Sequence, residues 1–136
     1  MDELRLKRYR DKINYIFDKI NLFTIKPRSE LEKDGILYGI QTSIESLIDI
    51  IAMLIKDLGI PVKDDISNID RIVKKIKINP ELGEKLKKAN HMRNLIVHRY
   101  NMIDENKIFN SIEDIRNLIL EWLDIIEEVL ENIDRY

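Results

Sequence analysis

The sequence contains no cysteine, so disulfide bonds, zinc–thiolate sites and thiol-based catalysis are excluded. Glycine and proline are scarce, with 4 and 3 residues among 136, which favours long helices joined by short connections. No stretch approaches the roughly eighteen uncharged apolar residues of a membrane span, and residues 1–20 are too charged for a secretory signal. We therefore expect a cytoplasmic protein with no membrane association.

Hydrophobic residues make up 44% of the chain and charged residues 35%. This balance is typical of a folded protein with a heavily charged surface, because a disordered chain would contain fewer apolar residues. The length is close to that of one ordinary domain, and no long linker divides the chain. We expect a single helical domain over residues 1–136.

Apolar residues recur at steps of three and four along most of the chain, which is the period of an amphipathic helix. Five helices are predicted. They cover about residues 2–23, 29–58, 67–77, 79–96 and 111–134, and Ser29 and Asn79 are the expected caps of the second and fourth. No segment shows sustained strand alternation. The pattern predicts an all-α fold, an antiparallel up-and-down bundle of four main helices plus a short helix.

The net charge of −2 conceals a strong asymmetry along the chain. Residues 71–99 contain nine Lys or Arg against two Glu, whereas residues 104–136 contain ten Asp or Glu against three Lys or Arg. A basic block in a balanced chain indicates a local anionic partner. The simpler alternative is a solvated helix face.

The most informative segment is R-N-L-I-V-H-R-Y at residues 93–100. Arg93 lies on or beside the apolar stripe of its helix, where a guanidinium needs charged partners or water. His98 follows three apolar residues, and histidine can act as both acid and base near neutral pH. Each residue could instead have a purely structural role. Arg93 could be a buried ion paired with a carboxylate of the last helix, and His98 could be structural or solvated.

This segment resembles the R-x4-H-x-Y signature of the HepT-like toxins of the HEPN superfamily. Arg93, His98 and Tyr100 match the signature with its spacing, and Asn94 supplies the polar residue that commonly follows the arginine. The order of the helices is also similar to that of the family along nearly the whole chain.

The resemblance implies a function as well as a fold. Family members are homodimers whose two motif helices form one composite cleft, and they cleave RNA without a metal ion or other cofactor. Each is the toxin of a type VII-like toxin–antitoxin pair. Its partner, a minimal nucleotidyltransferase, is the antitoxin and transfers AMP to the motif tyrosine, which corresponds to Tyr100.

In chemical terms, His98 would remove the proton of the RNA 2′-hydroxyl, and the second subunit's copy of this histidine would protonate the leaving oxygen. Arg93 would stabilise the charge that develops on the phosphate. On one regular helix the two side chains lie about 140° apart, so a dimer, or a break near His98, is needed for them to converge. The basic residues expected to bind the RNA backbone are Lys85, Lys87, Lys88 and Arg99.

Two rival functions remain open from the sequence. One is a non-catalytic subunit that binds a nucleotide or substrate for a small nucleotidyltransferase, and the other is a structural helical adaptor. A metal site at His91 and His98 is disfavoured because no cysteine or fixed carboxylate spacing accompanies them. Gly39, inside the second predicted helix, is expected to mark a close packing contact.

Overall fold

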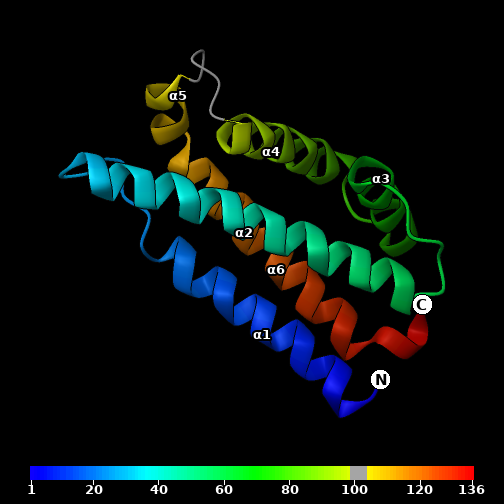
Figure 1. Ribbon diagram of the computed structural model, residues 1–136. Helices are drawn as coiled ribbons and strands as arrows, with labels where there is room; N and C mark the ends of the chain where they lie inside the picture. Colours follow the sequence, from blue (N-terminus) through cyan, green and yellow to red (C-terminus); the bar gives the residue numbers. More distant parts are fainter. Residues whose placement is uncertain (99–103) are drawn as a thin grey trace.

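The computed structural model describes residues 1–98 and 104–136, and within these ranges all regular structure is helical. The elements are α1 (Glu3–Ile20), α2 (Glu30–Asp57), α3 (Asp65–Ile76), α4 (Pro80–His98), α5 (Glu105–Asn110), α6 (Ile112–Glu131) and the 3₁₀ turn η1 (Ile133–Arg135). The long helices α1, α2, α4 and α6 alternate in direction, and α3 extends beside the C-terminal half of α2 (Figure 1). The predicted all-α up-and-down bundle is confirmed.

Side-chain caps decide where several helices begin. Ser29 accepts a hydrogen bond from the Glu32 amide at 3.0 Å and starts α2, as the capping pattern predicted. Asp64 accepts a hydrogen bond from the Ser67 amide at 2.9 Å and caps α3. The helix therefore starts at Asp65, two residues before the predicted start at Ser67. The predicted helix boundaries were therefore close, and the cap residue accounts for the difference in α3.

The short helix α5 was not predicted. It spans only six residues, which is less than two full turns and too short to establish an apolar period. Its first residues are capped by Asp104, whose carboxylate accepts from the Lys107 amide at 3.1 Å. The predicted final helix is likewise divided, because regular α6 ends at Glu131 and a 3₁₀ turn follows.

The helix α2 forms the centre of the bundle and packs against α1, α3 and α4. Its residues Ile40, Ile44, Leu47 and Ile50 are fully buried, which explains why its apolar stripe is wider than that of the other helices. By length and composition alone α2 could cross a membrane, but 56% of its most apolar window is buried inside the fold. Its hydrophobicity is accounted for by its central place in the core.

Close packing occurs at two helical glycines. A Cβ atom at Gly39 would lie 3.2 Å from Cε1 of Phe23, in the segment that follows α1. The contact expected at Gly39 is therefore present. A Cβ atom at Gly83 would lie only 2.9 Å from Cγ2 of Val73, so α3 and α4 approach closely at a position that the sequence did not single out.

Candidate functional site

Arg93 lies in the second half of α4 and faces the two neighbouring helices. Its Nη1 is 3.7 Å from Oε1 of Glu45 on α2, and its Nη2 is 3.6 Å from Oδ2 of Asp65 on α3. Nη2 also donates a 3.0 Å hydrogen bond to Oδ1 of Asn90, one turn earlier on α4. Three helices therefore fix the position of this guanidinium.

These ion pairs hold Arg93 without enclosing it. The arginine side chain is 19% exposed, and its two carboxylate partners are 37% and 44% exposed. Both separations exceed normal hydrogen-bond length, so each pair is a weak electrostatic attraction without a hydrogen bond. The Nε atom is buried and has no hydrogen-bond partner among the described residues. An additional acceptor could therefore reach the exposed part of the side chain but not the buried Nε.

The alternative in which Arg93 pairs with the last helix is not what the structure shows. Its ion pairs within the described chain are made with α2 and α3. A signal for one partner was present in the sequence, because Glu45 is an acidic residue within the most apolar helix. Asp65 could not be identified, since it stands beside the capping Asp64 and either residue could face α4.

His98 is the last residue of α4 and is exposed, as is Asn94. Arg93 and His98 therefore belong to one uninterrupted α-helix, on which a five-residue separation turns the side chains about 140° apart. The described residues show no helix break before His98 that would bring them together. Tyr100 and Arg99 lie outside the described residues.

Two of the apolar residues near His98 are exposed. Leu95 is 38% exposed and Val97 is 41% exposed, although both belong to the motif helix. Ile96, between them, is buried in the core. On a regular helix two residues separated by one position lie about 160° apart, so Leu95 and Val97 are exposed on opposite sides of α4, and the core-facing Ile96 lies between them.

Of the three α4 lysines expected to bind RNA, Lys85 and Lys87 are already close to carboxylates. Lys87 pairs with Asp70 and with Glu84, and hydrogen bonds to these two carboxylates raise the pKa of Lys87. Lys85 lies 3.6 Å from a carboxylate oxygen of Glu81.

Lys85 and Lys88 line one shallow groove between α4 and α6. That groove also contains Asp114 and Glu121, which balance its two positive charges. Within residues 1–98 and 104–136, no group of three His, Asp or Glu is placed to hold a metal ion.

Comparisons with known proteins agree with the motif. The family described as "Ribonuclease HepT-like" matches residues 6–133. A protein of Archaeoglobus fulgidus named "Putative RNase" is 41% identical over 131 residues, which cover 96% of this chain and 99% of that protein. A second "Putative RNase" of the same organism is 36% identical over 116 residues, covering 85% of this chain and 88% of that protein.

The fold also matches a solved structure described as "Crystal structure of the toxin-antitoxin with AMP-PNP". The TM-score is 0.72, and the match covers 93% of this chain and 99% of that chain at 18% sequence identity. This likeness establishes a shared fold. The resemblance carried by Arg93 and His98 is confirmed by the match of the family over nearly the whole sequence, and the chain belongs to the HepT-like ribonuclease family.

Proposed function

We propose that this protein is a cytoplasmic, homodimeric and metal-independent endoribonuclease that acts as the toxin of a toxin–antitoxin pair. The observation that carries the proposal is Arg93, which is held by Glu45, Asp65 and Asn90 and shares its helix with an exposed His98. The relatives named as RNases support the same activity.

The proposed reaction uses the nucleophile that RNA itself carries. His98 removes the proton of the 2′-hydroxyl, which attacks the adjacent phosphorus, and the bond from phosphorus to the 5′-oxygen breaks. The His98 of a second subunit gives a proton to that leaving oxygen. Arg93 donates hydrogen bonds to the phosphoryl oxygens as negative charge develops. The products are a 2′,3′-cyclic phosphate and a 5′-hydroxyl, and DNA resists because it lacks the nucleophile.

The dimer is proposed because one helix does not bring the two catalytic groups together. Arg93 and His98 diverge by about 140° on regular α4, so a partner's helix supplies the missing convergence. Leu95, three residues before His98, and Val97, four residues after Arg93, lie on opposite sides of α4, and each provides exposed apolar surface for such a contact. Asn94, exposed next to Arg93, is proposed to support the site by hydrogen bonding to RNA.

The partner is proposed to be a minimal nucleotidyltransferase that transfers AMP to Tyr100. The fold neighbour described as a toxin–antitoxin with AMP-PNP supports a partner of this kind. An AMP group adds bulk and a negative phosphate two residues from His98, which would repel and block the RNA phosphate. Lys85, Lys87, Lys88 and Arg99 remain proposed backbone contacts, although the carboxylates beside the first three reduce their contribution.

Expression in a bacterial host tests the proposal. We expect growth arrest by the wild-type protein and normal growth with His98→Ala. Co-expression with the proposed partner, a minimal nucleotidyltransferase, is expected to restore growth and to raise the intact mass by whole AMP units. Tyr100→Phe serves as the matched control, since it should stay toxic and unmodified. Equal toxicity of wild type and His98→Ala would contradict the catalytic assignment and favour a non-catalytic binding subunit.

A further inference from the structure

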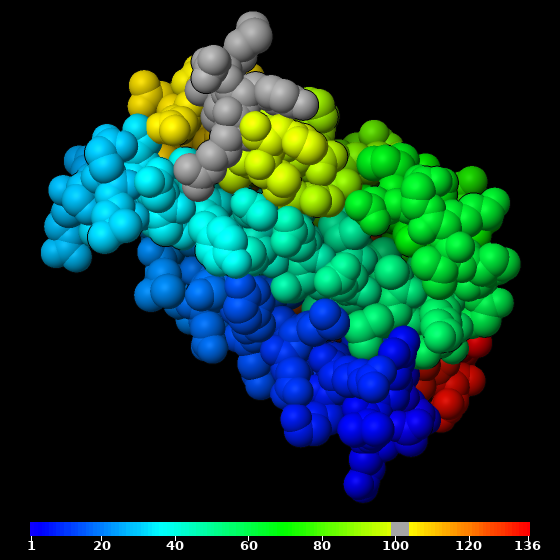
Figure 2. Space-filling view, viewed as in Figure 1, coloured from blue at the N-terminus to red at the C-terminus, as the bar shows by residue number. Residues whose placement is uncertain are grey.

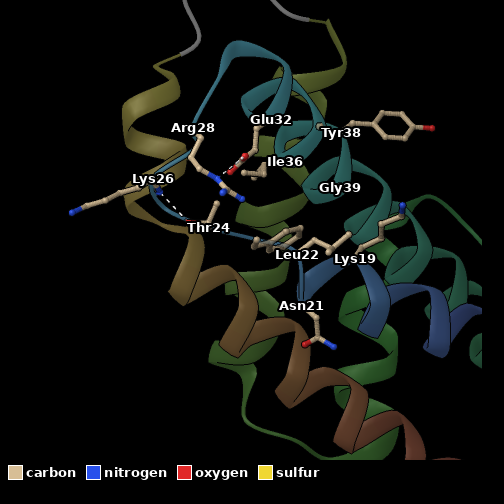
Figure 3. Close-up of a pocket in the computed structure, with 12 residues that line it drawn as sticks. Lys19, Asn21, Leu22, Thr24, Lys26, Arg28, Glu32, Ile36, Tyr38 and Gly39 are labelled. Carbon is tan, nitrogen blue, oxygen red and sulfur yellow. Dashed lines mark hydrogen bonds and ion pairs between the residues drawn. The ribbon is translucent and has the colours of Figure 1, made fainter.

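A cavity of about 780 Å³ lies between the end of α1 and the first half of α2, at the opposite end of α2 from the α2–α3 connection. Figure 3 shows Lys19 below Gly39, Arg28 beside Glu32, and Lys26 and Tyr38 extending outward on opposite sides. The volume falls within the range of about 300–1,000 Å³ that is usual for small-ligand sites. The cavity is therefore large enough for a nucleotide.

The cavity has a net positive charge. Lys19, Lys26 and Arg28 line it, and the only carboxylate among its lining residues is Glu32, which lies 3.4 Å from Nε of Arg28. Two cations are thus left without a carboxylate in the lining. By comparison, the groove of Lys85 and Lys88 contains as many carboxylates as lysines. Of these two sites, this cavity attracts a phosphate more strongly.

The remaining lining suits the rest of a nucleotide. Phe23 and Ile36 are buried apolar residues on its floor, and Asn21 and Thr24 offer polar groups. The ring of Tyr38 is 57% exposed at the rim. Exposed aromatic rings stack on RNA bases, which have an apolar face of similar size.

Arg116 of α6 holds the segment at the end of α1 that lines the cavity. Its Nε donates a 3.0 Å hydrogen bond to the carbonyl of Ile20, and its Nη2 donates a 2.6 Å hydrogen bond to the carbonyl of Phe23. Phe23 in turn packs against Gly39, where a side chain would be too close. The cavity is therefore built by the fold before any ligand arrives.

A surface stripe on α2 leads from the cavity to the motif arginine. Tyr38, Gln41 and Glu45 are spaced by three and four residues, so they share one face of the helix. Gln41 donates a 3.2 Å hydrogen bond to Glu45, which pairs with Arg93. Seven residues of helix place Tyr38 about 10 Å from Glu45 along the axis. Figure 2 shows α2 reaching the surface between α1 and α4.

We propose that this cavity binds a nucleotide of the RNA chain that flanks the cleaved bond. Lys26 lies on one side of the cavity, and Lys19 and Tyr38 lie on the other (Figure 3). The two lysines therefore contact two different phosphates of the RNA backbone, and Tyr38 stacks on a base beside Lys19. This inference rests on the proposed ribonuclease function and adds a subsite outside the R-x4-H-x-Y motif. The cavity would also supply unpaired positive charge for RNA, which Lys85 and Lys87 of α4 lack because they are paired with carboxylates.

Equilibrium binding of a labelled single-stranded RNA to the uncleaving His98→Ala protein tests the subsite. Adding Lys19→Glu and Lys26→Glu together is expected to weaken binding at least about tenfold and to reduce the salt dependence of log K by about two. Tyr38→Ala should weaken binding by about 5- to 150-fold, the range for loss of one stacked base. Lys63→Glu, the same charge change in the α2–α3 connection, should have little effect.

Gly35→Leu gives an independent steric test. A Cβ atom at Gly35 meets nothing within 4 Å, so the variant should fold while its side chain fills part of the cavity. We expect it to weaken RNA binding without lowering thermal stability. The subsite would be overturned if the cavity variants bound RNA as tightly as the His98→Ala protein from which they are made. It would also be overturned if that protein did not bind RNA.

The two proposals fail in different ways. If wild type does not cleave RNA but the cavity variants still weaken RNA binding, the ribonuclease function falls and the RNA-binding cavity stands. If wild type cleaves RNA and the cavity variants bind RNA normally, the ribonuclease function stands and the RNA-binding cavity falls. Loss of nucleotidyltransferase binding in these variants with unchanged RNA affinity would assign the cavity to a protein partner and overturn the inference.

Discussion

At the scale of single residues, Arg93 illustrates how a side chain can be held in place yet remain available. Its ion pairs with Glu45 and Asp65 are long and partly solvated, so each contributes about 0–1 kcal/mol to stability. Removing one donor to a developing oxyanion, by contrast, costs about 10²–10³ in kcat. The residue is therefore expected to matter far more to catalysis than to folding.

Arg93→Ala is predicted to reduce kcat/KM for RNA cleavage by about 10²–10³ and the free energy of unfolding by only about 1–2 kcal/mol. Cleavage rates and urea unfolding curves measured on the same preparation would compare the two effects. Arg93→Lys keeps the charge but not the paired donors, so it should recover stability more than activity. A large loss of stability with unchanged activity per folded molecule would mean that Arg93 is a structural ion.

Tyr9 has the opposite character, because it is buried far from the motif. Its hydroxyl donates a 2.5 Å hydrogen bond to Asp57, which also pairs with Arg5 at 2.9 Å. This cluster joins the start of α1 to the end of α2. Burial, followed by the hydrogen bond to Asp57, raises the pKa of Tyr9 above its ordinary value. Its protonated form is therefore favoured in the folded state.

Tyr9→Phe is predicted to lower the free energy of unfolding by about 1–2 kcal/mol at neutral pH without changing RNA cleavage. Because the folded-state pKa is raised, the contribution is complete below the ordinary value of 10.0 and declines as pH rises beyond it. Urea unfolding of both proteins across this range should show their difference narrowing above pH 10. A constant difference would contradict the assigned protonation.

At the scale of helices, the two glycines Gly83 and Gly35 make a matched pair. Both are helical, but a Cβ atom at Gly83 would lie 2.9 Å from Val73 whereas one at Gly35 meets open space. Alanine favours a helix over glycine by about 1 kcal/mol, so the surroundings decide the sign of each substitution.

We predict that Gly35→Ala stabilises the protein by about 0.5–1 kcal/mol and that Gly83→Ala destabilises it by about 1–2 kcal/mol. Thermal unfolding of the two variants beside wild type measures both. Val73→Ala combined with Gly83→Ala should recover part of the loss at Gly83, because the contact is with the Val73 side chain. Stabilisation by both single substitutions would show that α3 and α4 can separate at little cost.

The helices that sequence alone predicted well are those with a long apolar period and a recognisable cap. The caps Ser29 and Asn79 marked the starts of α2 and α4 correctly, and the family motif placed Arg93 and His98 in the same helix. The helix α5 was missed because its length carries no period. Which helices would face Arg93 could not be predicted, since that depends on tertiary packing and not on local spacing.

The α1–α2 cavity was missed for a related reason. Lys19 and Lys26 stand outside the basic block of residues 71–99, and nothing in their spacing marks a site. They line one cavity because α2 folds back along α1 and because Arg116 binds the carbonyl of Phe23 from a helix nearly a hundred residues later. Only the folded chain brings these elements together.

At the scale of the whole molecule, the proposed site needs a second copy of the chain. Leu95 and Val97 are exposed beside His98, and Arg93 and His98 diverge on their helix. Burial of either apolar residue between two copies would stabilise the proposed dimer and bring the motif residues of both copies together. Dimerisation and activity should therefore be lost together.

Val97→Glu is predicted to convert the dimer to a monomer and to abolish RNA cleavage while leaving the helical content unchanged. Light scattering coupled to size exclusion would report the mass, and circular dichroism the helix content. Leu4→Glu, at a still more exposed apolar residue at the start of α1, is the control and should leave the proposed dimer intact. A wild-type monomer that cleaves RNA would rule out the composite site.

The most direct test of the central claim is cleavage of a labelled RNA by the purified protein in EDTA, with the product ends identified by mass spectrometry. The account predicts 2′,3′-cyclic phosphate and 5′-hydroxyl ends from wild type, no cleavage of the matching DNA, and loss of activity in His98→Ala. Absence of cleavage, or cleavage that persists unchanged in His98→Ala, would contradict the assignment of Arg93 and His98 as a metal-independent ribonuclease site.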